Sequence, residues 1–190
     1  MHAIRLTVAG AVLGTVIGSL AMTAPAAAAD TRTCKGTIRS VSVDDVRVPK
    51  GATCTLIGTR VSGNVKVGSG AALVARDVRV DGDIQAEGAR SVSVTKGSKV
   101  DGNIQVEDSG SVTVTSTRVD GDIQLADNRR YLRVNGNRVD GNIQLQGNRK
   151  GLQVHRNSVK GNLECEDNRS KVTGGKNSVR GDKEGQCRRF

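Results

Sequence analysis

A short phrase, Val-x-Gly-Asn or Val-x-Gly-Asp with small variations, recurs along the chain and constrains its fold more than any other feature. It begins at Val61, Val80, Val100, Val119, Val139, Val159 and Val179. Successive starts lie 19 or 20 residues apart. Such a regular period is the signature of stacked structural repeats, in which each unit packs only on its neighbours.

Each repeat has the pattern of β-strands. The alternation from Val100 to Val106 puts apolar side chains on one face and polar side chains on the other. A second apolar pair follows later in each unit, such as Val112 and Val114. Residues that favour turns, namely Gly, Asn, Asp and Ser, separate the two segments. Each unit therefore predicts one coil of short strands around an interior of Val, Ile and Leu.

Other repeat architectures do not match this pattern. Helical solenoids need longer repeats, in which apolar residues recur every 3.6 positions. Leucine-rich repeats need a sequence signature that this chain lacks. Left-handed hexapeptide helices need coils in multiples of six residues. The sequence thus predicts an all-β protein, a right-handed parallel β-helix (β-solenoid) of about 7 coils of 19–20 residues, with coils about 4.8 Å apart.

The first 29 residues fit a secretory signal peptide. Arg5 supplies the basic region, Leu6 to Ala21 the apolar run, and Ala27-x-Ala29 the cleavage site. We therefore expect cleavage after Ala29 and a secreted protein, extracellular or associated with the cell envelope, without a transmembrane segment.

The expected organisation follows the repeats. Residues 1–29 are the signal peptide, and 30–60 form an N-terminal cap and the first coil. The β-solenoid repeats span 61–182, and 183–190 form a C-terminal cap.

Four cysteines lie near the ends of the repeat region. In an exported chain an even number of cysteines favours disulfides. Cys34 precedes Cys54 by 20 residues and Cys165 precedes Cys187 by 22, which is about one coil in each case. Side chains one coil apart lie within disulfide reach. The spacing therefore predicts the pairs Cys34–Cys54 and Cys165–Cys187, one at each end of the solenoid.

With these repeats and cysteines, the chain resembles a group of small secreted actinobacterial proteins with V-x-G-N-[IVL]-Q repeats. The similarity covers about Cys34 to Cys187. The C-terminal pattern of that group is matched by Gly161-Asn-Leu-Glu-Cys165, by Gly174 to Val179 and by Gln186-Cys187. The resemblance implies export and a β-solenoid. It implies no activity and transfers no catalytic residue.

Stacking converts each repeated position into a row. One outward row is acidic, with Asp81, Asp101, Asp120 and Asp140, and a row of basic residues lies two positions earlier: Arg60, Arg79, Lys99, Arg118 and Arg138. We expect the two rows to neutralise each other as surface ladders.

The acidic row also allows a different interpretation, a calcium site or carboxylate pair. Its ligands would come from Asp81, Asp83, Asp101, Asp120 and Asp122, because carboxylate oxygens suit Ca²⁺. That site would support the alternative function of a calcium-dependent polysaccharide lyase or hydrolase on a β-helix.

We expect three rows of amide side chains to have a structural role. They comprise Gln85, Gln105, Gln124 and Gln144, then Asn128, Asn148 and Asn168, then Asn137, Asn157 and Asn177. Stacked amides can form hydrogen bonds from coil to coil, and Asn tolerates the left-handed backbone of a tight corner.

The remaining basic residues are unevenly distributed. Residues 118–190 hold 16 basic and 9 acidic residues, whereas 30–117 hold 12 and 10. In the second half, Arg129, Arg149 and Arg169 recur at one position of the repeat with no acidic row beside them in the same motif. This basic row is a candidate binding site for an anionic wall polymer or polysaccharide.

The composition weighs against several function classes. With 1 Tyr, 1 Phe and no Trp, the chain lacks the aromatic residues on which nucleic-acid bases stack, so we expect no nucleic-acid partner. His155 is the only histidine after residue 29, and no catalytic motif occurs. The sequence therefore predicts a non-catalytic structural or binding module without a cofactor. A self-assembling β-helix scaffold is a further alternative, and the sequence does not set the oligomeric state.

Overall fold

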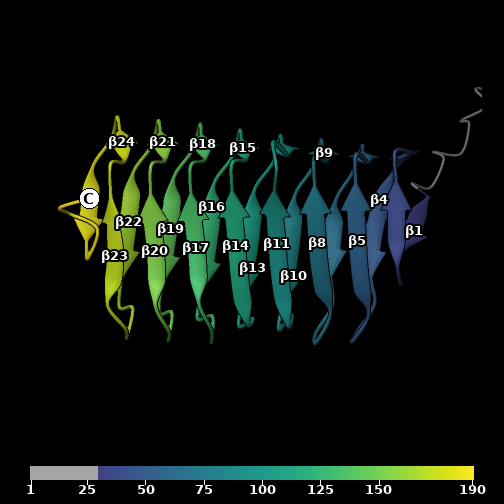
Figure 1. Cartoon of the computed structure of the whole chain (residues 1–190), viewed down its shortest axis with the longest axis horizontal. Helices are drawn as coiled ribbons and strands as arrows, with labels where there is room; N and C mark the ends of the chain where they lie inside the picture. The colour runs from purple at the N-terminus through teal and green to yellow at the C-terminus, as the bar shows by residue number, and fades with distance from the viewer. Residues whose placement is uncertain (1–29) are drawn as a thin grey trace, which may run out of the picture.

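The computed structural model describes residues 30–190, which form a β-solenoid built of three parallel sheets (Figure 1). We call them sheets A, B and C. Sheet A has nine strands: β1 (Thr31–Thr33), β4 (Asp45–Val48), β7 (Val65–Val67), β10 (Ile84–Glu87), β13 (Ile104–Glu107), β16 (Ile123–Ala126), β19 (Ile143–Gln146), β22 (Leu163–Glu166) and β25 (Lys183–Gly185).

Sheets B and C have eight strands each. Sheet B contains β2 (Thr37–Arg39), β5 (Thr53–Ile57), β8 (Ala72–Arg76), β11 (Ser91–Thr95), β14 (Ser111–Thr115), β17 (Leu132–Asn135), β20 (Leu152–His155) and β23 (Val172–Gly175). Sheet C contains the two-residue strands β3 (Ser42–Val43), β6 (Arg60–Val61), β9 (Arg79–Val80), β12 (Lys99–Val100), β15 (Arg118–Val119), β18 (Arg138–Val139), β21 (Ser158–Val159) and β24 (Ser178–Val179).

Each coil passes from sheet A to sheet B and then to sheet C before the next coil begins. Every strand pairs in parallel with its equivalent one coil away, for example β13 with β10 and β16. Figure 1 shows the coils stacked along one axis, winding in the right-handed sense. The predicted right-handed parallel β-solenoid is therefore confirmed, and the third side of each coil is a two-residue strand.

The recurring phrase forms the corner between sheets C and A. The chain bends after Val100, so the alternation from Val100 to Val106 is split between β12 and β13. A Cβ atom at Gly102 would lie 2.7 Å from the carbonyl oxygen of Gly82 in the preceding coil, so only glycine permits this approach. The next residue, Asn103, accepts the backbone N–H of Asp122 in the following coil at 2.8 Å.

At the position of Asn103, the fourth residue of the recurring phrase, Asp has the same role as Asn. The Asp83 carboxylate accepts the backbone N–H of Asn103 at 2.7 Å, as Asp122 does from Asn142 at 2.6 Å. Both residue types carry an oxygen that can accept this bond. The alternation of Asn and Asp between repeats therefore leaves the coil-to-coil hydrogen bond unchanged.

The interior of the solenoid is filled by columns of identical or similar aliphatic side chains. Ile84, Ile104, Ile123 and Ile143 stack in register and are fully buried. Val92, Val112 and Leu132 form the corresponding column of sheet B. Side chains that stack on their own kind fill the interior without gaps, which favours one register over any slipped alternative.

Two ladders of buried asparagine run along the corners that flank sheet B. Asn148 shows the pattern: its side-chain oxygen accepts the backbone N–H of Asn128 at 3.0 Å, and its amide donates to the carbonyl of Leu125 at 2.9 Å. Asn137, Asn157 and Asn177 repeat this arrangement at the other corner. Because these backbone groups are buried, the side chains replace the water that would otherwise solvate them.

The coil-to-coil bonding expected for the Asn and Gln rows is confirmed, but the expected left-handed backbone is not. Positive φ angles occur one residue earlier, at positions such as Asp127 (φ 53°) and Arg156 (φ 56°). The Asn residues themselves point inward. At each corner, one residue with a positive φ angle turns the chain, and the Asn that follows it forms the hydrogen bonds between coils.

Disulfides close both ends, as predicted. Cys34 is joined to Cys54, with Cα atoms 5.5 Å apart, and Cys165 is joined to Cys187, with Cα atoms 5.2 Å apart. At the C-terminal end Phe190 packs against Gly174 and the core. Gln186 accepts the N–H of Asn168 at 3.1 Å and so ends one Asn ladder.

The disulfides indicate an oxidising, extracellular environment for the protein. Within residues 30–190 we find no helix of the length and apolar character needed to cross a membrane. The predicted signal peptide, residues 1–29, lies outside the described residues.

Interrupting an Asn ladder should destabilise the protein strongly. Asn148→Ala leaves the N–H of Asn128 and the carbonyl of Leu125 without their partners, and we expect a loss of about 3 kcal/mol in the free energy of unfolding. The exposed neighbour Gln146 serves as control, because Gln146→Ala should cost less than about 0.5 kcal/mol. Urea unfolding measures both, and equal losses would contradict the assigned role of the ladder.

Removing the C-terminal disulfide should loosen one end first. The variant Cys165→Ser with Cys187→Ser should lose about 3 kcal/mol. Amide hydrogen exchange should accelerate in β22 and β25 while β13 stays protected, because each coil contacts only its neighbours. Uniform loss of protection along the solenoid would show that the ends are not independently stapled.

Candidate functional site

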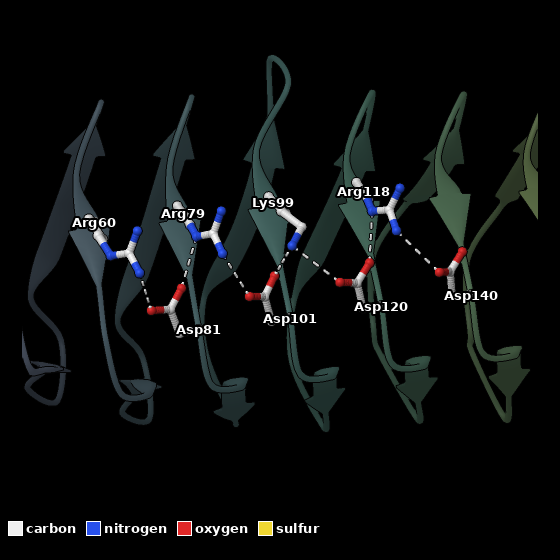
Figure 2. A network of polar contacts seen from close by, with 8 residues as sticks. All are labelled: Arg60, Arg79, Asp81, Lys99, Asp101, Arg118, Asp120 and Asp140. Atoms are coloured by element: carbon white, nitrogen blue, oxygen red, sulfur yellow. Dashed lines mark hydrogen bonds and ion pairs between the residues drawn. The ribbon is translucent and has the colours of Figure 1, made fainter.

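Charged side chains form a continuous ladder along sheet C and its corner with sheet A (Figure 2). Arg60 contacts Asp81 at 2.7 Å, and Arg79 bridges Asp81 at 3.0 Å and Asp101 at 3.1 Å. The same alternation continues through Lys99, Asp120, Arg118, Asp140 and Lys160. The predicted neutralisation of the acidic row by a basic row is thus present.

The ladder differs from the expected one at its C-terminal end. Arg138 belongs to the basic row by position, but among the described residues it has no carboxylate oxygen within 4.0 Å. Asp140 is bound instead by Arg118 at 3.2 Å and by Lys160 at 2.9 Å. The basic row ends at Ser158 and the acidic row becomes Lys160, so the alternation stops there.

The cations stabilise the ionised form of the acidic row. A hydrogen bond from Arg79 is the largest cause that lowers the pKa of Asp81, and one from Lys160 has the same effect on the pKa of Asp140. Since Arg79 and Lys160 are exposed to solvent and the two carboxylates are only partly covered, each pair contributes little to stability. The ladder therefore has nearly balanced charge, with five cations against four carboxylates.

The five carboxylates considered for calcium do not converge on one point. Asp81, Asp101 and Asp120 are engaged by Arg or Lys. Asp83 and Asp122 lie in the column that accepts backbone N–H groups of the next coil. Within residues 30–190 no three His, Cys, Asp or Glu side chains are gathered closely enough to hold a metal ion.

Arg129, Arg149 and Arg169 lie at the corner between sheets A and B, each directly after a buried ladder asparagine. Their backbone N–H groups bond to the preceding coil at 2.8, 2.9 and 2.9 Å. This backbone bonding places the three residues in one column, and all three side chains are exposed. The structure therefore brings together the basic row that the sequence predicted.

One expectation about this basic row is wrong. An acidic row does stand beside it, because Asp108, Asp127 and Asp167 occupy the left-handed position of the same corner. Arg129 lies 3.4 Å from Asp108, which belongs to the preceding coil. Arg149 and Arg169 have no carboxylate oxygen within 4.0 Å among the described residues. Gly147 interrupts the acidic row at the coil of Arg149.

The same corner holds further cations at other positions of the repeat, and the sequence prediction did not include them. The three consecutive corner segments are 127–133, 147–153 and 167–173, and together they hold 7 basic and 2 acidic residues. The added cations are Arg130, Arg133, Lys150 and Lys171. The consecutive pairs Arg129-Arg130 and Arg149-Lys150 were the signal that could have revealed them. We call these three segments the basic corner.

Tyr131 also lies on the basic corner, with 72% of its surface exposed. Its ring lies against Gly151 of the next coil, where a side chain would collide with it. This coil has one more residue at the corner than its predecessor, since Val112 pairs with Leu132 while Arg129 stacks beside Gly110. Tyr131 directly precedes inward Leu132, as Ser111 precedes inward Val112, so strand alternation directs it outward.

The chain matches no protein-family model, no curated protein and no solved structure.

The charged ladder should make stability depend on pH in the acidic range. The pKa of Asp81 and of Asp140 is lower in the folded protein than in the unfolded chain, where it is about 3.9. Their contribution is complete above about pH 5 and is lost as the pH falls through the lowered values. Asp81→Asn with Asp140→Asn should therefore flatten the decline of Tm between about pH 5 and pH 3.

A charge-matched control separates the ladder from general charge effects. Asp77 and Asp127 are exposed, lie at turns with φ of 52° and 53°, and make no ion pair within 4.0 Å among the described residues. Thermal melting followed by circular dichroism compares the two double variants. If Asp77→Asn with Asp127→Asn flattens the curve equally, the ladder is not the cause.

Proposed function

We propose that the protein is a secreted, non-catalytic binding module that holds an anionic polymer along the basic corner. The observation that carries this proposal is the contrast between two surfaces of one fold. On sheet C almost every carboxylate is matched by a cation, whereas the basic corner holds 7 cations against 2 carboxylates.

The solenoid gives these cations a regular spacing. Backbone hydrogen bonds hold Arg129, Arg149 and Arg169 one coil apart, which is about 4.8 Å. A polymer with a negative charge on each unit can contact several cations at once, and such multivalent contacts raise affinity without any single strong contact. Because the cations are exposed, the attraction should weaken as salt rises.

The compartment suggests the chemical class of the polymer. Outside the cell the accessible polyanions are wall polymers and acidic polysaccharides, whose charges are phosphates or carboxylates. Arg binds both through paired N–H groups. The proposed partner is therefore an anionic cell-envelope polymer or polysaccharide.

A binding role also fits the chemistry available on the surface. The carboxylates that a polysaccharide lyase or hydrolase would use are engaged with cations or backbone N–H groups. The backbone of His155, the one histidine of the described residues, is held in sheet B by the side chain of Asn135 at 3.0 Å.

Salt-dependent binding to polyphosphate and to polygalacturonate tests the proposal. The wild-type protein should bind both polymers, and the logarithm of its affinity should fall linearly with the logarithm of the salt concentration. Changing Arg129, Arg149 and Arg169 to Gln should reduce that slope by about 2 to 3, since each lost contact releases about one counterion fewer.

The control removes the same charge elsewhere. Arg39, Arg76 and Arg138 are exposed, lie outside the basic corner and have no side-chain partner among the described residues. Changing these three to Gln should leave the slope within about 0.5 of the wild-type value. Equal losses in both triple variants, or no binding by the wild type, would refute the assigned site.

A further inference from the structure

Sheet A presents an outward column whose charge changes in order along the solenoid. From β4 to β25 its members stack in register. They are Arg47, Lys66, Gln85, Gln105, Gln124, Gln144, Glu164 and Glu184. The column thus runs from basic through neutral to acidic.

The neutral centre of this column is a rigid strip. Gln85 donates to Gln105 at 3.4 Å, and Gln105 donates to Gln124 at 2.9 Å. The bonds continue through Gln144 to Glu164, at 3.2 and 3.0 Å. Side chains held in this way lose little further entropy if another surface packs against them.

Because of this order of charges, the column is complementary to the same column of a second copy that runs in the opposite direction. A two-fold axis that runs parallel to the strands, midway between β13 and β16, turns the column end for end. It places Arg47 opposite Glu184 of a second copy and Lys66 opposite Glu164. The four Gln residues then face one another across the centre. A symmetric interface makes each contact twice.

The neighbouring outward column, which contains Glu87, Glu107, Ala126, Gln146 and Glu166, matches its reverse in shape at part of its length. Under the same axis Glu107 faces Ala126, which lines a hollow between Glu107 and Gln146. Glu166 faces Gly68. A long side chain is therefore placed opposite a short one at these two pairs, whereas Glu87 faces Gln146, a side chain of similar length.

The alternative symmetric arrangement is disfavoured by charge. An axis along the solenoid would place each coil on the same coil of its partner. Strand β22 would then face β22 of the second copy, so Glu164 and Glu166 of the two copies would lie opposite each other. Like charges in contact oppose association.

We propose that sheet A is a self-association surface, on which two copies of this chain dock face to face with their solenoid axes antiparallel. The eight strands from β4 to β25 lie about 4.8 Å apart and have about four residues each, which gives a face of roughly 500 Å² per partner. That area is at the low end for specific interfaces. The dimer is therefore weak and sensitive to salt, and it uses neither the basic corner nor the charged ladder.

Sedimentation equilibrium of the purified protein tests the proposal. A reversible monomer–dimer equilibrium is expected at low salt, and dissociation is expected as salt is raised. A protein that stays monomeric at every concentration in low salt would overturn the proposal.

Charge reversal at one symmetric contact provides the decisive variant. Arg47→Glu alone, or Glu184→Arg alone, places like charges at both copies of that contact and should weaken the dimer by about tenfold. An equimolar mixture of the two variants should associate again, because each copy now complements the other. Neither side chain has a partner among the described residues, so both variants should fold.

Two comparisons make the outcome unambiguous. Lys66→Glu mixed with Glu164→Lys should behave in the same way, and Lys96→Glu, exposed at the corner between sheets B and C, should leave association unchanged. Failure of both mixtures to recover association would overturn the antiparallel arrangement. Association of each single variant at the wild-type strength would overturn sheet A as the surface.

Discussion

Parallel hydrogen bonding between successive coils is the interaction on which the rest of this structure depends. Each strand bonds to its equivalents one coil before and one coil after, so residues about twenty apart in sequence become neighbours in space. Every repeated position then becomes a column, and a column has properties that a single residue lacks. A buried Ile column fills the core, a Gly column permits close approach, and an Asn column bonds the corners.

The polar columns form hydrogen bonds with the backbone groups that the apolar interior shields from water. Three narrow sheets around a dry interior leave corner backbone groups buried and outside the regular strand pairing. Asn128, Asn148 and Asn168 satisfy these groups at one corner, and the Asn/Asp column that contains Asn103 does so at another. Inside and corner are thus specified by different residues of the same repeat. The disulfides and Phe190 close the ends, where the repeat can no longer supply a neighbour.

The outer surface is where the coils are free to differ, and the three outward regions differ in charge. The ladder from Arg60 to Lys160 is neutralised, the outward column of sheet A is graded from basic to acidic, and the basic corner carries an excess of cations. A rigid scaffold holds each pattern at a fixed spacing, so binding requires little rearrangement of the backbone. The proposed polymer binding and the proposed self-association therefore use separate faces.

The sequence by itself determined the repeat, the parallel coils, the inward residues, both disulfide pairs and the basic row, because a strict period assigns each residue to a column. Only the tertiary structure decided what stands beside each column. It placed Asp108 next to Arg129, left Arg138 out of the ladder and laid the ring of Tyr131 against Gly151. It also split the run from Val100 to Val106 between two sheets. The physical reason is that a period fixes neighbours along the axis, whereas neighbours around a coil depend on where the chain bends, and those bends are fixed by backbone packing between coils.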